Sequence, residues 1–280
     1  MIVIKAATEL NHFLNGLKIK SKKIGFVATM GALHSGHISL IERSNRENDT
    51  TVCSIFVNPR QFNDPKDLEK YPRPIEKDIL LLVKAGCNVL FIPDYEDIYS
   101  PNYVEPKINL EGLDTILEGA MRPGHFKGVA LVVKRLFECV KPDAAYFGQK
   151  DYQQTLVIKQ IVKEFKLPVK IVVTEIHREE NGLAMSSRNI RLSYEQRNRA
   201  GFIYSALLQL KSNLKYLDIN EALIKAKESI LKEAGAKIEY LTIVEPDTLA
   251  QIEKIDQERS AIALVVVNYF GVRLLDNIYL

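Results

Sequence analysis

Hydrophobic residues in the first part of the chain form short runs of two alternating kinds. Apolar, β-branched runs typical of buried strands occupy residues 24–30, 51–57, 88–93, 144–147 and 169–176. Helical spacing of apolar residues lies between them, at 37–48, 74–85, 126–140 and 152–165. Strands that alternate with helices predict a parallel sheet covered on both faces. We therefore predict an α/β fold, a Rossmann-like doubly wound parallel sheet, for residues 1–176.

The pattern changes after this point. A polar loop at 177–182 is followed by helical stretches at 194–214 and 220–234. Strand patterns then occupy 238–244, 261–267 and 272–275. This order predicts a second, smaller α+β domain over 177–280, with the polar loop as a hinge that lets the domain act as a lid.

Composition narrows the class of protein. The chain has 280 residues, of which 46% are hydrophobic, enough for a large core without disulfides. The formal net charge of +3 gives no reason to expect a nucleic-acid or membrane partner. Cys53, Cys87 and Cys139 are odd in number, widely separated and set among apolar residues, which indicates reduced core cysteines rather than a catalytic thiol. The N-terminus lacks the long apolar stretch after a basic region that is typical of a signal peptide, so we expect a cytoplasmic protein.

Candidate chemistry lies where strands end, because ligands of such sheets bind beyond the carboxyl ends of the strands. The first segment is residues 29–37, TMGALHSGH. Gly31 permits a tight turn, and His34 and His37 are three apart, on one side of a helical turn. Together with helix N-terminal amides they favour a polyphosphate. A zinc site is disfavoured, because the His-Glu-x-x-His pattern is missing. A helix cap with two incidental histidines stays open.

Two further segments suit phosphate. Lys150 follows the strand at 144–147 and can present a point charge, while Asp151 can accept hydrogen bonds from a ribose. The alternative is a capped helix with a solvated Lys-Asp pair. Residues 185–188, Met-Ser-Ser-Arg, offer two hydroxyls and a guanidinium. A merely basic loop is the alternative there, since Arg191 follows closely.

Two polar islands complete the candidates. Asn58 and Gln61 stand just beyond the strand at 51–57. Glu118, Arg122 and His125 lie in a loop rich in glycine and proline. Such loops are often binding elements or lids, with surface decoration as the alternative.

Six segments in one order carry a family resemblance: TMGALHSGH, FVNPRQF, YPR with Asp78 after it, LEGAMRPGHFKGV, YFGQKDYQQ and GLAMSSRN. Over nearly its whole length the chain resembles the pantothenate synthetases, or pantoate–β-alanine ligases. That family belongs to the nucleotidyltransferases with a His-x-Gly-His signature, related in fold to the catalytic domain of class I aminoacyl-tRNA synthetases.

The resemblance implies an enzyme, a ligase that joins pantoate to β-alanine through a pantoyl adenylate. It implies ATP with Mg²⁺, release of AMP and pyrophosphate, and a homodimer. It implies catalytic roles for His34, His37, Lys150 and Arg188. It implies that ATP is bound by Met30, Gly31, Ala32, Leu33, His34, Ser35, Gly36, His37, Gly148, Gln149, Lys150, Asp151, His177, Met185, Ser186, Ser187 and Arg188. It implies that pantoate or β-alanine is bound by Gln61, Gln154, Asn58, Tyr71 and Arg122. Asp78 is a candidate metal ligand.

The chain departs from the family pattern at two places. Ala28 stands where the family usually has proline, and residues 175–178, Glu-Ile-His-Arg, replace a Pro-x-Val-Arg run. His177 therefore takes a usually apolar place near adenine. Contact through its backbone and stacking of its ring beside the base both stay open.

Two other functions remain as alternatives. Another nucleotidyltransferase of the same fold would explain the histidines and residues 186–188, but not Gln61, Gln154 and the Arg122 loop. A non-catalytic module would bind ATP without turnover. A dinucleotide oxidoreductase is disfavoured, because no G-x-G-x-x-G follows the strand at 24–30.

Overall fold

The computed structural model describes residues 1–254 and 260–280. They form two compact units. The first consists of Met1–Gly148 and Gln153–Thr174, and the second of Gln149–Tyr152 and Glu175–Leu280. The sequence suggested a boundary after residue 176. The observed division runs two residues earlier and also places the short segment Gln149–Tyr152 with the C-terminal unit.

The first unit is built on one parallel sheet, which confirms the predicted fold class. Its strands are β1 (Ile2–Ile4), β2 (Ile24–Thr29), β3 (Thr50–Ile55), β4 (Val89–Phe91), β5 (Ala144–Gly148) and β6 (Lys170–Thr174). All neighbours pair in parallel, in the order β1-β4-β3-β2-β5-β6. The order reverses between β2 and β5, so this is the switch point of a doubly wound sheet.

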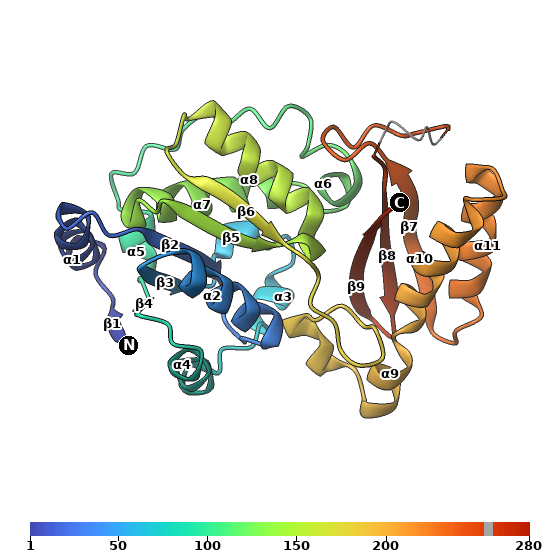
Figure 1. The fold of residues 1–280 in the computed structure, drawn as a ribbon, viewed down its shortest axis with the longest axis horizontal. Coiled ribbons are helices and arrows are strands. Elements are labelled where there is room, and N and C mark those ends of the chain that lie inside the picture. The colour runs from blue at the N-terminus through green and yellow to red at the C-terminus, as the bar shows by residue number, and fades with distance from the viewer. Residues whose placement is uncertain (255–259) are drawn as a thin grey trace. The chain divides into compact units, whose positions relative to one another are not determined.

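Helices cover both faces of this sheet. Figure 1 shows α2 (Ser35–Glu47) and α4 (Ile75–Lys84) on one face, and α7 (His125–Val140) and α8 (Tyr152–Glu164) on the other. α1 (Ala7–Ile19) packs against α7. Short helical turns complete the unit: η1 (Pro59–Gln61), α3 (Pro65–Glu69), α5 (Tyr95–Ile98) and α6 (Leu117–Met121). The sequence patterns missed β1 and α1, because β1 has three residues and α1 buries only Leu10 and Leu14.

The second unit has its own core between a sheet and helices. Strands β7 (Ala236–Val244), β8 (Ile262–Tyr269) and β9 (Val272–Tyr279) form an antiparallel sheet. Figure 1 shows α10 (Phe202–Asn213) and α11 (Ile219–Leu231) beside it, and α9 (Tyr194–Arg199) precedes them. The remaining turns are η2 (Gln149–Asp151) and η3 (Ser187–Arg191). The second unit is therefore the α+β fold that the sequence predicted.

Two elements of this unit differ from prediction. The single helix expected over 194–214 is divided at Gly201, where a Cβ would lie 2.0 Å from the Asn181 carbonyl oxygen. The last strand was expected over 272–275. β9 instead continues to Tyr279 with the polar side chains of Asp276 and Asn277 buried. A strand can carry buried polar residues only where they find hydrogen-bond partners.

The three cysteines are buried and free, as predicted. Burial raises the pKa of all three thiols, that of Cys87 to about 11. A raised pKa keeps the thiol protonated, and the thiolate is the nucleophilic form. These cysteines are therefore core residues and poor nucleophiles.

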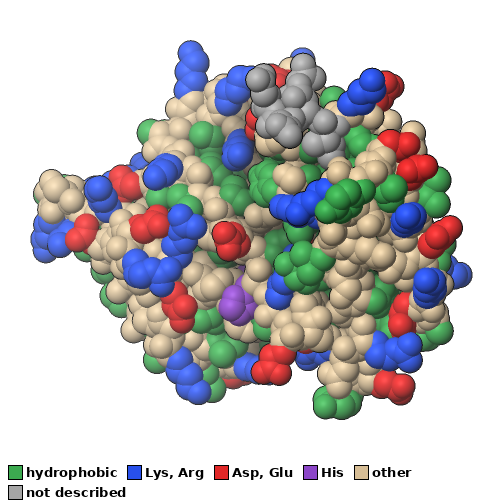
Figure 2. All heavy atoms as spheres, turned by 45° about the vertical axis from the view of Figure 1, so that its right-hand side comes forward, with side chains coloured by type: hydrophobic (Ala, Val, Ile, Leu, Met, Phe, Trp, Pro, Cys, Tyr) green, Lys and Arg blue, Asp and Glu red, His purple; other side chains and the backbone are tan. Residues whose placement is uncertain are grey.

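Charged side chains of both signs are interspersed on the surface. The face drawn in Figure 2 carries lysines and arginines among aspartates and glutamates, without one continuous basic field. This agrees with the small formal net charge of +3. Within the described residues, no helix has the length and apolar character needed to cross a membrane.

Candidate functional site: a histidine-capped helix and a lysine held by the last strand

His34 and His37 lie side by side at the start of α2. His34 is the N-cap residue, and its Nδ1 accepts from the Gly36 backbone N–H at 3.2 Å. The Nδ1 of His37 accepts from the His34 backbone N–H at 3.4 Å, which closes a capping box. The two ring centroids are 4.0 Å apart. The histidines therefore do cap the helix, which was one alternative, and they also share one side of the turn, as expected.

This capping fixes the chemistry that the rings present. A neutral imidazole has one protonated and one acceptor nitrogen, and here Nδ1 is the acceptor in both rings. The proton therefore lies on Nε2, which makes each Nε2–H a donor. α2 is 13 residues long, and its N-terminal amides carry partial positive charge. Two N–H donors at a helix N-terminus suit a phosphate.

A buried carboxylate shapes the loop before the histidines. The Asp78 side chain, 1% exposed, accepts from the backbone N–H of Leu33 at 2.8 Å and from that of Ala32. Burial raises the pKa of the Asp78 carboxyl, while these two amides act in the opposite direction. The carboxylate accepts both amides and thereby fixes the backbone of the turn, while a metal-ligand role for Asp78 stays a prediction.

Gly31 and Tyr71 define the turn itself. Gly31 has φ of +83°, and a Cβ there would lie 3.0 Å from an Asp78 oxygen. The Tyr71 hydroxyl donates to the Gly31 carbonyl at 3.4 Å. The turn that leaves β2 is thus set by a glycine conformation, a carboxylate and a phenol.

Gln61 is the centre of the polar island beside this turn. Its Oε1 accepts from Asn58 Nδ2 at 3.1 Å, and its Nε2 donates to Met30 Sδ at 3.0 Å. Asn58 is fully buried and also donates to the Gly128 carbonyl at 3.1 Å. Asn58 therefore orients Gln61, and Gln61 reaches a residue of the first segment, as expected of a common site.

Arg122, the C-cap residue of α6, and His125, the first residue of α7, support Gln61. Arg122 Nη1 donates to His125 Nε2 at 3.0 Å, and His125 Nδ1–H donates to the Gln61 carbonyl at 2.8 Å. An arginine can only donate, so this arrangement requires a neutral His125. The polar residues around Gln61 are thus a connected network and not surface decoration.

Gly128→Ala tests how closely this network is packed. A Cβ at Gly128 would lie 2.3 Å from the Arg60 carbonyl oxygen and 2.8 Å from Gln61 Cα. We expect the free energy of unfolding to fall by about 3 kcal/mol, as for an overpacked core. Urea unfolding measures it, with Gly16→Ala in α1 as control, since nothing lies within 4 Å of that Cβ. The control should gain about 0.5–1 kcal/mol. Equal stability of Gly128→Ala and the unaltered chain would contradict the close approach.

The second unit contains the predicted lysine and the serine-arginine segment. Lys150 Nζ pairs with Asp151 Oδ1 at 2.9 Å, and the Lys150 side chain is only 17% exposed. The lysine is therefore largely buried and not the solvated residue of the alternative interpretation. Ser186 caps η3, with its Oγ accepting from the Arg188 backbone N–H at 3.3 Å. Asn189, which follows Arg188, is buried, and its side-chain amide donates to the Ala184 carbonyl at 3.1 Å. This bond fixes the turn.

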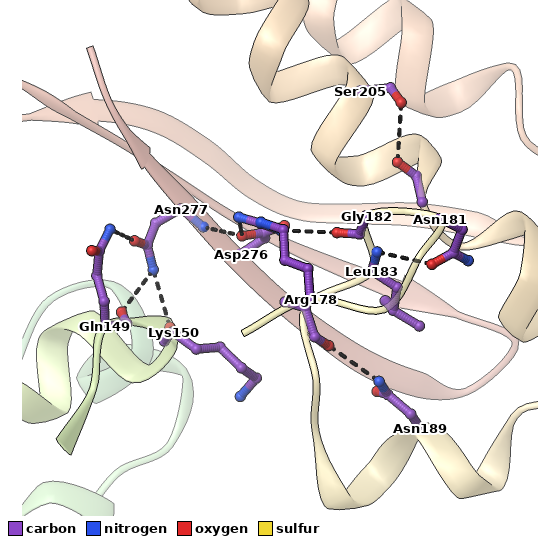
Figure 3. Close-up of polar contacts among 12 residues, drawn as sticks. Gln149, Lys150, Arg178, Asn181, Gly182, Leu183, Asn189, Ser205, Asp276 and Asn277 are labelled. Atoms are coloured by element: carbon purple, nitrogen blue, oxygen red, sulfur yellow. Dashed lines mark hydrogen bonds and ion pairs between the residues drawn. The ribbon is translucent and has the colours of Figure 1, made fainter. Parts of the chain in front are cut away.

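The segment before it is a short hairpin closed by Arg178. Arg178 forms a bidentate ion pair with Asp276 at 2.6 and 2.8 Å, and it donates to the Gly182 carbonyl at 3.0 Å (Figure 3). Its guanidinium also stacks on Tyr204, 3.6 Å from the ring centroid. Burial raises the pKa of the Asp276 carboxyl, and Arg178 acts in the opposite direction.

His177 and Met185 face each other across this hairpin. The Met185 backbone N–H donates to the His177 carbonyl at 3.0 Å, and the His177 side chain is exposed. His177, which differs from the usual residue of the family, is thus held in the hairpin by its backbone carbonyl. Its exposed ring is accessible to a ligand.

Sequence reasoning missed three buried polar residues. Asp276 and Asn277 of β9 contact the lysine loop and the hairpin. Gln153 accepts from the Glu118 backbone N–H at 3.1 Å and donates to the Leu113 carbonyl at 2.7 Å, which orders the loop before α6. For Asp276 and Asn277, the available signal in the sequence was a pair of polar residues beside an apolar strand pattern. Among the described residues, no group of three or more histidine, cysteine or acidic side chains is arranged to hold a metal ion.

Fold and site together define a class: an α/β protein with a phosphate-type helix N-terminus at the switch point of a Rossmann-like sheet. Sequence comparison identifies the family. The sequence model of the pantoate-beta-alanine ligases matches residues 2–279. The chain therefore belongs to the pantoate–β-alanine ligase family, and it is an enzyme of the ligase class.

Curated relatives and solved structures agree with this. The pantothenate synthetase of Cytophaga hutchinsonii is 47% identical over 282 residues, which cover 99% of both chains. That of Bacteroides fragilis is 43% identical over 99% of this chain and 98% of its own. The pantothenate synthetase of Thermus thermophilus superposes with a TM-score of 0.92 at 40% identity, over 99% of both chains. A Francisella tularensis pantoate-beta-alanine ligase, solved with "Beta-gamma ATP and Beta-alanine", has a TM-score of 0.80 at 39% identity, over 99% of this chain and 97% of its own.

Proposed function

We propose that this chain joins pantoate to β-alanine at the expense of ATP, through a pantoyl adenylate. The observation that carries the proposal is the capping box of His34 and His37, which places the proton of both rings on Nε2 at the N-terminus of α2. Membership of the pantoate–β-alanine ligases supplies the substrates. The Francisella relative with bound nucleotide and β-alanine supports ATP and β-alanine as ligands.

The first step needs charge neutralisation and no base. A carboxyl with a pKa of about 4 is ionised at neutral pH, so a pantoate oxygen can attack the α-phosphorus directly. The new bond is carboxylate O–P, and the bond that breaks releases pyrophosphate. Two anions must meet, and donors must receive the charge that grows on the phosphates. We assign this role to His34, His37, Lys150, Ser186, Ser187 and Arg188. Mg²⁺ would accompany ATP and would supply further positive charge to the phosphates, beside the residues assigned above.

The second step transfers the acyl group. The β-alanine amine attacks the acyl carbon, the bond to AMP breaks, and the nitrogen loses a proton. The Nδ1 of both histidines already accepts a backbone N–H, and Nε2 is protonated. Neither ring then offers a basic nitrogen, so we assign the proton to solvent. The adenylate must be kept from water before this step, which suits the C-terminal unit as a lid.

Gln61 and Gln154 are the proposed pantoate ligands. Gln61 Nε2 currently donates to the Met30 sulfur, a weak acceptor. A pantoate oxygen can replace that sulfur with a gain in hydrogen-bond strength. Asn58, Tyr71 and Arg122 then act on pantoate or β-alanine mainly by holding Gln61 and the Gly31 turn in place.

The other ATP contacts follow from the same assignment. We propose that Gly148 and Asp151 lie toward the ribose and that residues 30–37 line the nucleotide site with Gln149, His177 and Met185. A homodimer and a cytoplasmic location are part of the same proposal, supported by family membership. Size-exclusion chromatography with light scattering tests the dimer.

Substrate omission tests the function. We expect AMP release from ATP only when pantoate and β-alanine are both present. Transfer of AMP to another acceptor without pantoate would identify a different nucleotidyltransferase, and ATP binding without turnover would identify a non-catalytic module.

Gln154→Ala should raise the KM for pantoate about tenfold and change the KM for ATP little, as expected for one lost hydrogen bond to a charged group. Steady-state kinetics of AMP formation measures both constants. Gln160→Ala, on the same helix, is the control, because its amide donates to the Asn109 carbonyl. An effect of Gln154→Ala on ATP alone would contradict the assignment.

A further inference from the structure

The last strand of the protein carries two consecutive buried polar residues that reach distant parts of the sequence. Asp276 is 4% exposed and Asn277 is 2% exposed, in a strand that is otherwise apolar at its buried positions. Asp276 contacts Arg178, and Asn277 contacts Gln149 and Lys150 (Figure 3). Buried polar groups at such positions require an explanation beyond packing.

Asn277 uses its whole amide on the lysine loop. Its Nδ2 donates to the backbone carbonyls of Gln149 at 3.0 Å and Lys150 at 3.1 Å, and its Oδ1 accepts from Gln149 Nε2 at 2.9 Å. These bonds hold two successive carbonyls of η2. They fix the backbone from which the lysine side chain projects.

Asp276, the preceding residue of β9, fixes the neighbouring hairpin at residues 178–184. Both its oxygens pair with Arg178, and Oδ1 also accepts from the Asn277 backbone N–H at 2.7 Å. Arg178 in turn holds Gly182, and the paired backbone of Arg178 and Ala184 leads directly into residues 185–188. Two adjacent residues of β9 therefore anchor the two segments of the second unit that are proposed to bind phosphate, the loop with Lys150 and residues 185–188.

We propose that Asn277 is a positioning residue for adenylate formation, which acts by holding Lys150 in register with the Ser186–Arg188 turn that Asp276 and Arg178 secure. The proposal rests on the function proposed above. A lysine has four rotatable side-chain bonds and behaves as a movable point charge, so its backbone must be fixed for the charge to meet one phosphate. A displacement of about 1 Å can cost about a hundredfold in rate.

A double-mutant cycle on the intact protein separates positioning from general stability. The assay is pantoate-dependent exchange of labelled pyrophosphate into ATP, with the melting temperature measured for each variant. Asn277→Ala should lower kcat about ten- to a hundredfold. In a Lys150→Met background the same change should lower kcat less than about twofold, because the group it positions is gone. Asn268→Ala is the control, since it removes one side-chain bond, to the Gly271 N–H, from the same sheet; its kcat should be unchanged.

Equal loss from Asn277→Ala in both backgrounds, or no loss in the first, would overturn the positioning role. If Asn277→Ala does not fold, Asn277→Ser is used, because its hydroxyl can donate to one of the two carbonyls. Its loss should be smaller, about threefold to tenfold, and should again vanish with Lys150→Met. Absence of pantoate-dependent exchange in the unaltered chain would instead overturn the proposed function itself.

Discussion

His37→Asn is expected to lower AMP formation at least about a hundredfold, the effect of losing one donor to a reacting phosphate. The expected loss comes from Nε2–H, which asparagine lacks. The asparagine Oδ1 can still accept the His34 backbone N–H that His37 Nδ1 accepts now. The free energy of unfolding should therefore change by less than about 1 kcal/mol. Steady-state AMP release and urea unfolding measure the two quantities on the same preparation.

His34→Asn should behave alike, since asparagine is a favoured N-cap residue. The alanine variants should lose activity to the same degree and in addition lose about 1 kcal/mol of stability with the cap. His12→Ala is the control, because His12 is an exposed histidine of α1. Near-normal turnover of His37→Asn would remove this imidazole from catalysis and leave it a cap alone.

Lys150→Met is expected to lower kcat for adenylate formation about a hundred- to a thousandfold. Methionine keeps an unbranched side chain but carries no charge, so the negative charge that grows on the phosphates loses one of its proposed cations. The Lys150 side chain is 17% exposed, so solvent cannot easily supply a substitute. Pre-steady-state measurement of pyrophosphate release with pantoate in excess and without β-alanine reports the rate of this step.

Lys159→Ala is the matched control, an exposed lysine on α8 that should leave the rate unchanged. Lys150→Arg should restore little, because a planar guanidinium cannot take the place of a compact ammonium. A rate for Lys150→Met within about threefold of the unaltered chain would contradict the role assigned to the lysine.

The fold was predictable where apolar runs were long. The runs at 24–30 and 51–57 gave β2 and β3 almost to the residue, because central parallel strands are buried on both faces and contain few polar residues. The strand at Ile2–Ile4 was missed, since three residues form no recognisable pattern. The helix expected over 194–214 is interrupted at Gly201, which lies so close to the Asn181 carbonyl that a Cβ would clash, a tertiary feature that no local pattern contains.

The sequence supplied candidate site residues but not the contacts that each of their side chains makes. Sequence alone placed His34 and His37 on one turn, yet capping and phosphate binding were treated as alternatives. The structure shows the cap, and because Nδ1 accepts the capping bonds while Nε2 keeps the proton, capping is compatible with the proposed phosphate binding. Asn58 and Asp78 were identified as site residues, but their partners, the Gln61 amide and the Ala32 and Leu33 backbone, became visible only in three dimensions.

Asn277 illustrates what sequence could not supply. It lies beyond the end of the predicted strand, and its partners lie 127 and 128 positions earlier in the chain. A buried amide and a strand end look alike in one dimension. Only the fold shows which carbonyls such a side chain satisfies.

Exchange of labelled pyrophosphate into ATP tests the central claim most directly. It reports reversible formation of the pantoyl adenylate without the second step. We predict rapid exchange that requires pantoate, proceeds without β-alanine and is lost at least about a hundredfold in His37→Asn. Folded protein that binds ATP and pantoate but shows no pantoate-dependent exchange would contradict the account.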